Sequence, residues 1–184
     1  MRMTDTILRF AACLAIATCA ASSSVSAEET APDLLTFAQG ALPVSIATGD
    51  VDLRVGMDKA IAIIDGNPEG FVVIGKPAAP DGFVEIVYEL PAETQFHRFA
   101  VPSVLETPSA YQTFFQTVEV WGSAAAPEGE YTLLASGELS THEQVGQVTE
   151  LTLTDDQPDV RWVRLRLSGG VSIEAEKSFL EFSE

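Results

Sequence analysis

The sequence contains few cysteines, few basic residues and no long hydrophobic run. Its 184 residues include 2 cysteines, 10 lysines and arginines, and 27 aspartates and glutamates, for a formal net charge of −17. This acidic excess repels phosphate, which excludes a general nucleic-acid-binding protein. With 46% hydrophobic residues, the chain is too apolar to be disordered. The composition therefore predicts one globular domain of ordinary size.

The first 27 residues have the pattern of a secretory signal peptide. Arg2 and Arg9 precede an apolar stretch at residues 10–21, and small residues follow as far as Ala27. The stretch is shorter than the roughly 20 residues of a membrane-spanning helix, so we expect cleavage and no membrane span. Cleavage after Ala27 removes both cysteines and leaves 157 residues with a net charge of −18. The alternative is a lipoprotein signal in which Cys19 becomes the lipidated first residue, although the threonine before it fits such a site poorly.

After an acidic leader at residues 28–36, short apolar runs alternate with turns rich in glycine, proline and aspartate. Strict alternation of apolar and polar residues, as at 163–167, is typical of antiparallel strands with one buried face. Helical periodicity is confined to residues 57–64. The pattern predicts an all-β fold in residues 37–184, a jelly-roll β-sandwich of about eight antiparallel strands. The predicted strands are 71–74, 84–90, 96–101, 114–121, 131–135, 148–154, 160–167 and 179–182.

Three sets of segments are distinctive together: 62–67 with Phe71, 114–123 with 131–135, and 159–165 with 181–182. In order and spacing they resemble the discoidin-like family, also called coagulation-factor type C or galactose-binding-like domains. The first is an Asp-Gly-Asn turn followed by an aromatic residue that begins a strand. The second resembles the family's central strand pair, and the third resembles its late Arg-aromatic-aliphatic-Arg strand with a closing acidic strand. The resemblance covers roughly residues 34–184 and implies a galactose-binding-like sandwich.

A narrower resemblance concerns residues 98–121, which look like the N-terminal region of some OmpA-family outer-membrane proteins of Gram-negative bacteria. In those proteins a discoidin-like module precedes further domains. The sequence stops at Glu184, directly after the last predicted strand and without a closing turn or polar tail, so we expect a fragment of a longer chain. The signal and this resemblance together predict export to the periplasm, or to the outer membrane and cell envelope.

The discoidin-like resemblance implies a structural Ca²⁺ ion beside the Asp-Gly-Asn turn. Carried over to this chain, its ligands are the carboxylates of Asp65 and Glu181, with a backbone oxygen from Asn67. Family members commonly have a threonine two residues before the aromatic, whereas this chain has Glu69 and Gly70 before Phe71, so one expected oxygen is missing. The alternative is that Asp-Gly-Asn forms a turn and nothing more.

The resemblance also implies that loops at one end of the sandwich meet the ligand, through exposed aromatic, arginine and histidine side chains. Sugars stack an apolar face on a ring while fixed polar groups hold their hydroxyls. For each candidate a structural role is the alternative, such as a place in the core or on a solvated face. The ligand-binding candidates are His97, Arg98, Tyr111, Phe115 and His142.

Motifs of catalysis are missing from the sequence. It has no Gly-x-Ser-x-Gly elbow, no His-Glu-x-x-His pair and no phosphate-binding glycine loop, so we expect no enzyme activity. The first hypothesis is an exported recognition module that binds a glycan or another cell-envelope component, within an OmpA-family envelope protein. The second is a structural or protein-interaction domain of the envelope that binds no sugar and packs against a neighbouring domain.

Overall fold

In the computed structural model of the protein, residues 32–49, 51–53, 56–67, 71–77, 82–102, 113–139, 147–172 and 180–183 are described. Residues Asp33–Glu184 form one compact unit. The expected signal at residues 1–27 lies outside the described residues. The elements are η1 (Phe37–Gln39), β1 (Leu42–Gly49), β2 (Val51–Leu53), α1 (Met57–Ala62), β3 (Phe71–Pro77), β4 (Phe83–Thr94), β5 (Ala100–Pro102), β6 (Thr113–Ser123), β7 (Thr132–Glu138), β8 (Val148–Glu150), β9 (Thr152–Leu153), β10 (Val160–Ser172) and β11 (Leu180–Ser183).

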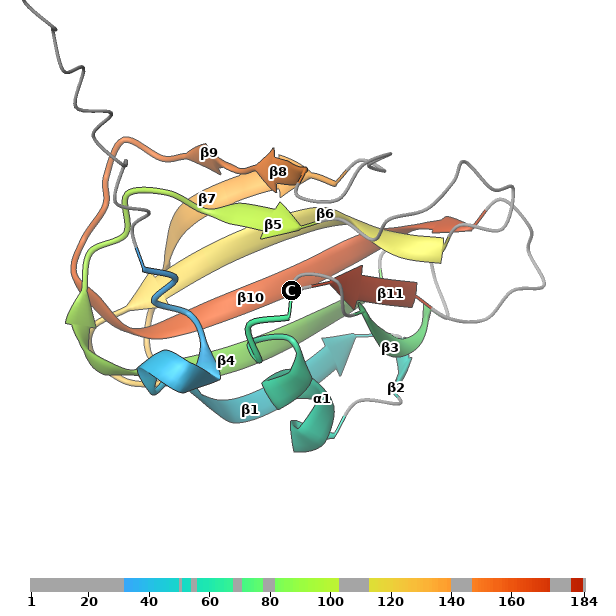
Figure 1. Cartoon of the computed structure of the whole chain (residues 1–184), viewed down its shortest axis with the longest axis horizontal. Coiled ribbons are helices and arrows are strands. Elements are labelled where there is room, and N and C mark those ends of the chain that lie inside the picture. Colours follow the sequence, from blue (N-terminus) through green and yellow to red (C-terminus); the bar gives the residue numbers. More distant parts are fainter. Residues whose placement is uncertain are drawn as a thin grey trace, which may run out of the picture. The chain divides into compact units, whose positions relative to one another are not determined.

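The principal sheet has the strand order β1-β4-β10-β6-β11-β3-β2, and β7 pairs with both β6 and β9. Neighbours are antiparallel except β11 and β6, which are parallel at Glu181 and Phe114. β6 is 11 residues long, so its first part lies beside β11 and its second part beside β7. The long strands β4, β10 and β6 cross the middle of Figure 1 side by side, with α1 and β5 in front of them. The predicted all-β sandwich is confirmed.

Alternation along the central strands sorts their side chains onto two faces. In β10, Val163, Leu165 and Leu167 are buried, while the residues between them are partly exposed. The inner residues of β4 and of the second part of β6 also recur at every second position and join one hydrophobic core: 84, 86, 88, 90, 118 and 120. This core also takes in Ile63 and Ile64 after α1, so α1 covers the inner face of the sheet.

Close packing against β7 requires a glycine at position 122 of β6. A Cβ built there would lie 2.5 Å from Val160 Cγ1 and 2.8 Å from Leu134 Cδ1. Both neighbours are buried core residues, so neither has room to withdraw.

The structure has eleven strands among its described residues, and the difference from the expected eight has physical reasons. β1 and β2 were not predicted, because β1 contains Pro43 and its exposed positions follow no strict alternation. The expected strand at 148–154 is two strands, β8 and β9, which pair with β5 and β7 respectively. Between them the N–H of Leu151 donates to the carbonyl of Phe99 at 2.9 Å.

The strand expected at residues 96–101 is also shorter than predicted. Only Ala100–Pro102 are in a strand, because Phe96 and Phe99 both point into the core although they are three residues apart. Their rings pack with centroids 4.8 Å apart. A strand would have turned these two rings to opposite faces. The helix expected at 57–64 ends at Ala62, and Ile63 and Ile64 follow in a turn.

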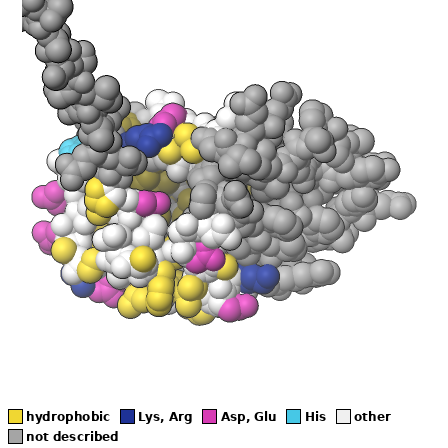
Figure 2. All heavy atoms as spheres, viewed as in Figure 1, with side chains coloured by type: hydrophobic (Ala, Val, Ile, Leu, Met, Phe, Trp, Pro, Cys, Tyr) yellow, Lys and Arg dark blue, Asp and Glu magenta, His cyan; other side chains and the backbone are white. Residues whose placement is uncertain are grey.

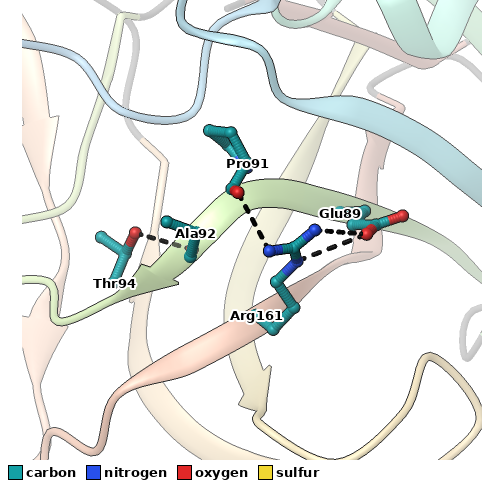
Figure 3. A network of polar contacts seen from close by, with 5 residues as sticks. All are labelled: Glu89, Pro91, Ala92, Thr94 and Arg161. Carbon is teal, nitrogen blue, oxygen red and sulfur yellow. Dashed lines mark hydrogen bonds and ion pairs between the residues drawn. The ribbon is translucent and has the colours of Figure 1, made fainter.

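A bulge between β4 and β10 is held by one arginine. Val160 pairs with Thr94 and Trp162 pairs with Glu89, so β4 has several extra residues opposite Arg161. The Arg161 guanidinium donates to Glu89 Oε1 from Nη2 at 2.8 Å and to the carbonyl of Pro91 from Nη1 at 2.9 Å (Figure 3). Arg161 therefore satisfies a backbone carbonyl that the bulge takes out of the ladder.

Candidate functional site

The connection between β4 and β5, residues 95–99, presents two of the candidate ligand-binding side chains. Phe96 and Phe99 are 7% and 9% exposed and anchor the connection in the core. His97 and Arg98, between these anchors, are exposed. The two phenylalanines therefore anchor the backbone of this connection in the core, while the two polar side chains between them face the solvent.

Arg98 is joined to Glu150 at the end of β8. Its Nε lies 2.9 Å from Glu150 Oε1 and 3.1 Å from Oε2, and Nη2 also donates to Oε1. The hydrogen bonds and the charge of Glu150 raise the pKa of Arg98 above its usual value, so the guanidinium stays charged. Arg98 Nη1 has no hydrogen bond to the described residues. The pair thus offers a donor and an acceptor side by side, which suits a sugar hydroxyl that both donates and accepts.

The remaining ligand-binding candidates do not join this loop in the described part of the chain. Tyr111 and His142 lie outside the described residues. Phe115 is 0% exposed in β6 and belongs to the hydrophobic core, so its assignment as a ligand contact is corrected. Strict alternation from Val118 and Val120 would place residue 115 on the opposite face, because it lies three and five positions away from them. The alternation is interrupted at residues 116–117, so the sequence pattern does not predict the burial of Phe115.

The Asp65–Gly66–Asn67 segment forms a turn at the end of α1. Asp65 Oδ1 accepts from the backbone N–H of Asn67 at 2.8 Å, and Gly66 has the left-handed φ of 83° that favours glycine. All three residues are exposed. Glu181 lies in β11, paired with Val73 of β3, and its side chain is outside the described part.

This turn supplies oxygen donors of the kind Ca²⁺ uses, but only part of a coordination shell. No group of three histidine, cysteine, aspartate or glutamate side chains among the described residues is placed to hold a metal ion. The turn itself explains the Asp-Gly-Asn sequence through the Asp65 hydrogen bond. A calcium ion there would use the second oxygen of Asp65, together with donors beyond the described side chains.

Sequence reasoning missed two features beside these candidates. Glu150 had no motif to mark it, since its partnership with Arg98 joins residues 52 positions apart. The second is the stacking of the Arg164 guanidinium over the Tyr131 ring, 3.8 Å from its centroid, on the outer face of the sheet. The Arg-Leu-Arg-Leu alternation of β10 did predict that its arginines face outward.

No helix among the described residues could span a membrane. The helices there are η1, with three residues, and α1, with six, and neither has the length or apolar character to cross a bilayer.

Comparison with solved structures finds relatives with the same arrangement of strands. The module CpGH89CBM32-5 of Clostridium perfringens, in complex with GalNAc-β-1,3-galactose, is 15% identical with a TM-score of 0.50, covering 76% of this chain and 91% of that chain. The family 32 carbohydrate-binding module of C. perfringens NanJ, in complex with galactose, is 16% identical with a TM-score of 0.50, over 78% and 96% of the two chains. The fold is a galactose-binding-like β-sandwich.

A fragment of a chitobiase-like protein from Bacteroides thetaiotaomicron shares this galactose-binding-like fold. It is 13% identical with a TM-score of 0.57, over 85% of this chain and 92% of that chain. The sequence matches no protein-family model and no curated protein. At these identities the likeness shows the galactose-binding-like fold and leaves function to the site.

Proposed function

We propose that this chain is a non-catalytic, exported recognition module that binds a glycan or another cell-envelope component through the loop of His97 and Arg98. The observation that carries the proposal is the presentation of these two side chains by a loop that two buried phenylalanine rings hold rigid. The Arg98–Glu150 pair adds a fixed donor and acceptor for sugar hydroxyls. Solved structures of this fold in complex with galactose and with GalNAc-β-1,3-galactose support the sugar as ligand.

The proposal also includes the location of the protein and a bound calcium ion. The signal-like first 27 residues support export, and the resemblance of residues 98–121 supports placement in an OmpA-family protein of a Gram-negative envelope. The Asp65 turn serves as a structural Ca²⁺ site, with Asn67 and Glu181 contributing further oxygens. Its support is the family resemblance and the oxygen chemistry of the turn.

A glycan array followed by pull-down on insoluble polysaccharides and peptidoglycan tests the proposed recognition. The wild-type protein should bind a defined set of glycans, and His97→Ala and Arg98→Gln should each weaken that binding without lowering the melting temperature. Lys59→Gln, on α1, is the matched control because it removes one positive charge away from the loop. Binding that survives both loop substitutions would overturn the assignment of the site.

One observation favours the second function, a protein-interaction domain without sugar binding. Leu42 of β1 and Met57 of α1 are 50% and 44% exposed. Figure 2 shows hydrophobic side chains gathered along the lower edge of the view, where Figure 1 places β1 and α1. A folded protein that binds no glycan on the array or in the pull-down would favour this second function over the first.

A further inference from the structure

The outer face of the principal sheet carries two neighbouring rows of side chains that differ in charge. Pairing registers place Glu85, Arg166 and Glu119 side by side across β4, β10 and β6. In the next row Val87, Arg164 and Trp121 stand side by side on the same three strands. The core side chains of these strands point to the opposite face.

Arg166 is balanced by the carboxylates beside it. Its Nη1 donates to Glu85 Oε1 at 2.8 Å, and its Nε lies 3.7 Å from Glu119 Oε2. The guanidinium also lies over the Phe83 ring, 4.0 Å from its centroid. The two glutamates therefore pair with the charge of Arg166, and the Phe83 ring covers one face of its guanidinium.

Arg164 has no carboxylate partner among the described residues. Its row neighbours are apolar, its guanidinium stacks on Tyr131, and its Nε is shielded from solvent without a hydrogen-bond partner. The other described arginines, Arg98, Arg161 and Arg166, each pair with a glutamate. In a chain with 27 acidic and 10 basic residues, an arginine without such a pair is unusual. Its row and stacking neighbours are Val87, Trp121 and Tyr131, while Glu85 and Glu128 lie near enough to Tyr131 to act on its charge without pairing with Arg164.

Aromatic side chains continue around Arg164. Trp162 precedes it by two positions on the same face of β10, and Trp121 faces it across the β10–β6 ladder. Tyr131 is held in place by its hydroxyl, which donates to the carbonyl of Pro127 at 2.8 Å. Rings of this kind stack on the apolar faces of sugars, and a planar guanidinium binds a carboxylate through two parallel hydrogen bonds.

We propose that this aromatic row around Arg164 is a second glycan-binding surface, separate from the His97–Arg98 loop, that takes an acidic polysaccharide. Trp121 and Trp162 stack on the sugar rings, Tyr131 holds the guanidinium that lies over its ring, and Arg164 pairs with the carboxylate of a uronic acid residue. The choice of a glycan as ligand rests on the proposed function. The choice of an acidic glycan rests on Arg164, which forms no ion pair with a carboxylate of the described residues.

The net charge of −17 opposes the approach of an anionic chain. At physiological ionic strength charges beyond about 8 Å are largely screened, so contacts within the row decide binding. The half-buried setting of Arg164 strengthens its pairing with a carboxylate, because less water competes for the guanidinium.

Binding of the wild-type protein and its variants to polygalacturonate, to the same polymer with its carboxylates methyl-esterified, and to neutral galactan tests the proposal. Affinity gel electrophoresis gives the dissociation constants. We expect Arg164→Gln to weaken polygalacturonate binding about tenfold or more, and esterification to weaken wild-type binding to the same degree. Arg164→Lys keeps the charge but loses the paired hydrogen bonds, so its affinity for polygalacturonate should lie between those of the wild type and Arg164→Gln.

Arg98→Gln is the matched control because it changes the net charge equally and lies at the loop. It should leave polygalacturonate binding unchanged and weaken neutral glycan binding, while Arg164→Gln should do the reverse. Neutral glycan binding without any polygalacturonate binding would overturn this inference and leave the proposed function standing. Equal polygalacturonate binding by wild type and a folded Arg164→Gln would overturn it as well. A loss of polygalacturonate binding in Arg164→Gln, with no effect of Arg98→Gln on any glycan, would support this inference and overturn the proposed site at the His97–Arg98 loop.

Discussion

The hydroxyl of Tyr88 donates a hydrogen bond of 3.0 Å to the backbone carbonyl of Ala60, 28 residues earlier in the chain. Tyr88 is 0% exposed on the inner face of β4, and Ala60 lies in the last turn of α1. Carbonyls in the last turn of a helix have no partner within the helix, so this bond satisfies one of them and holds α1 on the sheet.

Replacing Tyr88 with phenylalanine should lower the free energy of unfolding by about 1 to 3 kcal/mol, because it leaves a buried carbonyl without this donor. Urea denaturation followed by circular dichroism measures the loss. Tyr131→Phe is the matched control, since its hydroxyl bonds to Pro127 in a half-buried setting where water can replace it. Equal losses in the two variants would show that the Tyr88 bond does not hold α1.

Phe115 should behave as a core residue in spite of its aromatic side chain. Phe115→Ala is expected to cost about 3 to 5 kcal/mol of unfolding free energy, because the ring is fully buried and its removal leaves a cavity. Phe37, which is 50% exposed, supplies the control, and Phe37→Ala should cost much less. Similar costs in urea denaturation would contradict the placement of Phe115 in the core.

Two arginine–glutamate pairs of similar geometry should differ in their effect on stability. Arg161→Gln removes the bonds to Glu89 and to the Pro91 carbonyl and should cost about 1 kcal/mol, discounted for the partial exposure of the pair. Arg98→Gln breaks a pair in which both side chains are more than half exposed, so no change in thermal unfolding is expected. A larger loss in Arg98→Gln than in Arg161→Gln would contradict this ranking.

Tyr131 should make stability fall in alkaline solution. Burial raises its pKa above the usual 10.0, and the Arg164 charge offsets part of that rise by favouring the phenolate. The folded protein therefore keeps the phenol proton at a pH where the unfolded chain has released it. Stability is complete below about pH 10 and declines as the pH rises through the folded pKa. Denaturation free energies across this range should decline less steeply in Tyr131→Phe, and parallel profiles would rule out the contribution of Tyr131.

The calcium proposal is tested with Asp65→Asn. The asparagine side chain keeps an oxygen that can accept from the N–H of Asn67, so the turn is preserved while the charge on which the ion depends is lost. Calcium at about a hundredfold its dissociation constant should add about 2.7 kcal/mol of stability to the wild type and much less to the variant. Both should melt at the same temperature in EDTA. The absence of heat in a calorimetric titration of the wild type, with no rise in its melting temperature, would reject the ion.

Periodicity was sufficient to predict the long central strands. β10 alternates between buried aliphatic residues and partly exposed ones at residues 163–167, and β4 does so at residues 83–86, before Val87 interrupts the pattern. This alternation is fixed by the two-residue repeat of a strand whatever its neighbours are. The two-turn limit on the helix after Gly56 followed likewise from local signals. The end of the strand before Ala100 did not, because Phe96 and Phe99 reach the same core from a non-strand backbone.

The candidate site, too, could be predicted from the sequence only in part. The sequence by itself determined an acidic all-β domain behind a signal-like segment, and it marked His97, Arg98 and the Asp65 turn, because these depend on composition and on residues close together in the chain. Only the tertiary structure decided that Phe115 is core, that Glu150 holds Arg98, and that Arg164 stands among rings without a carboxylate. The physical reason is that burial and charge pairing are set by strand register, which joins residues far apart in the sequence.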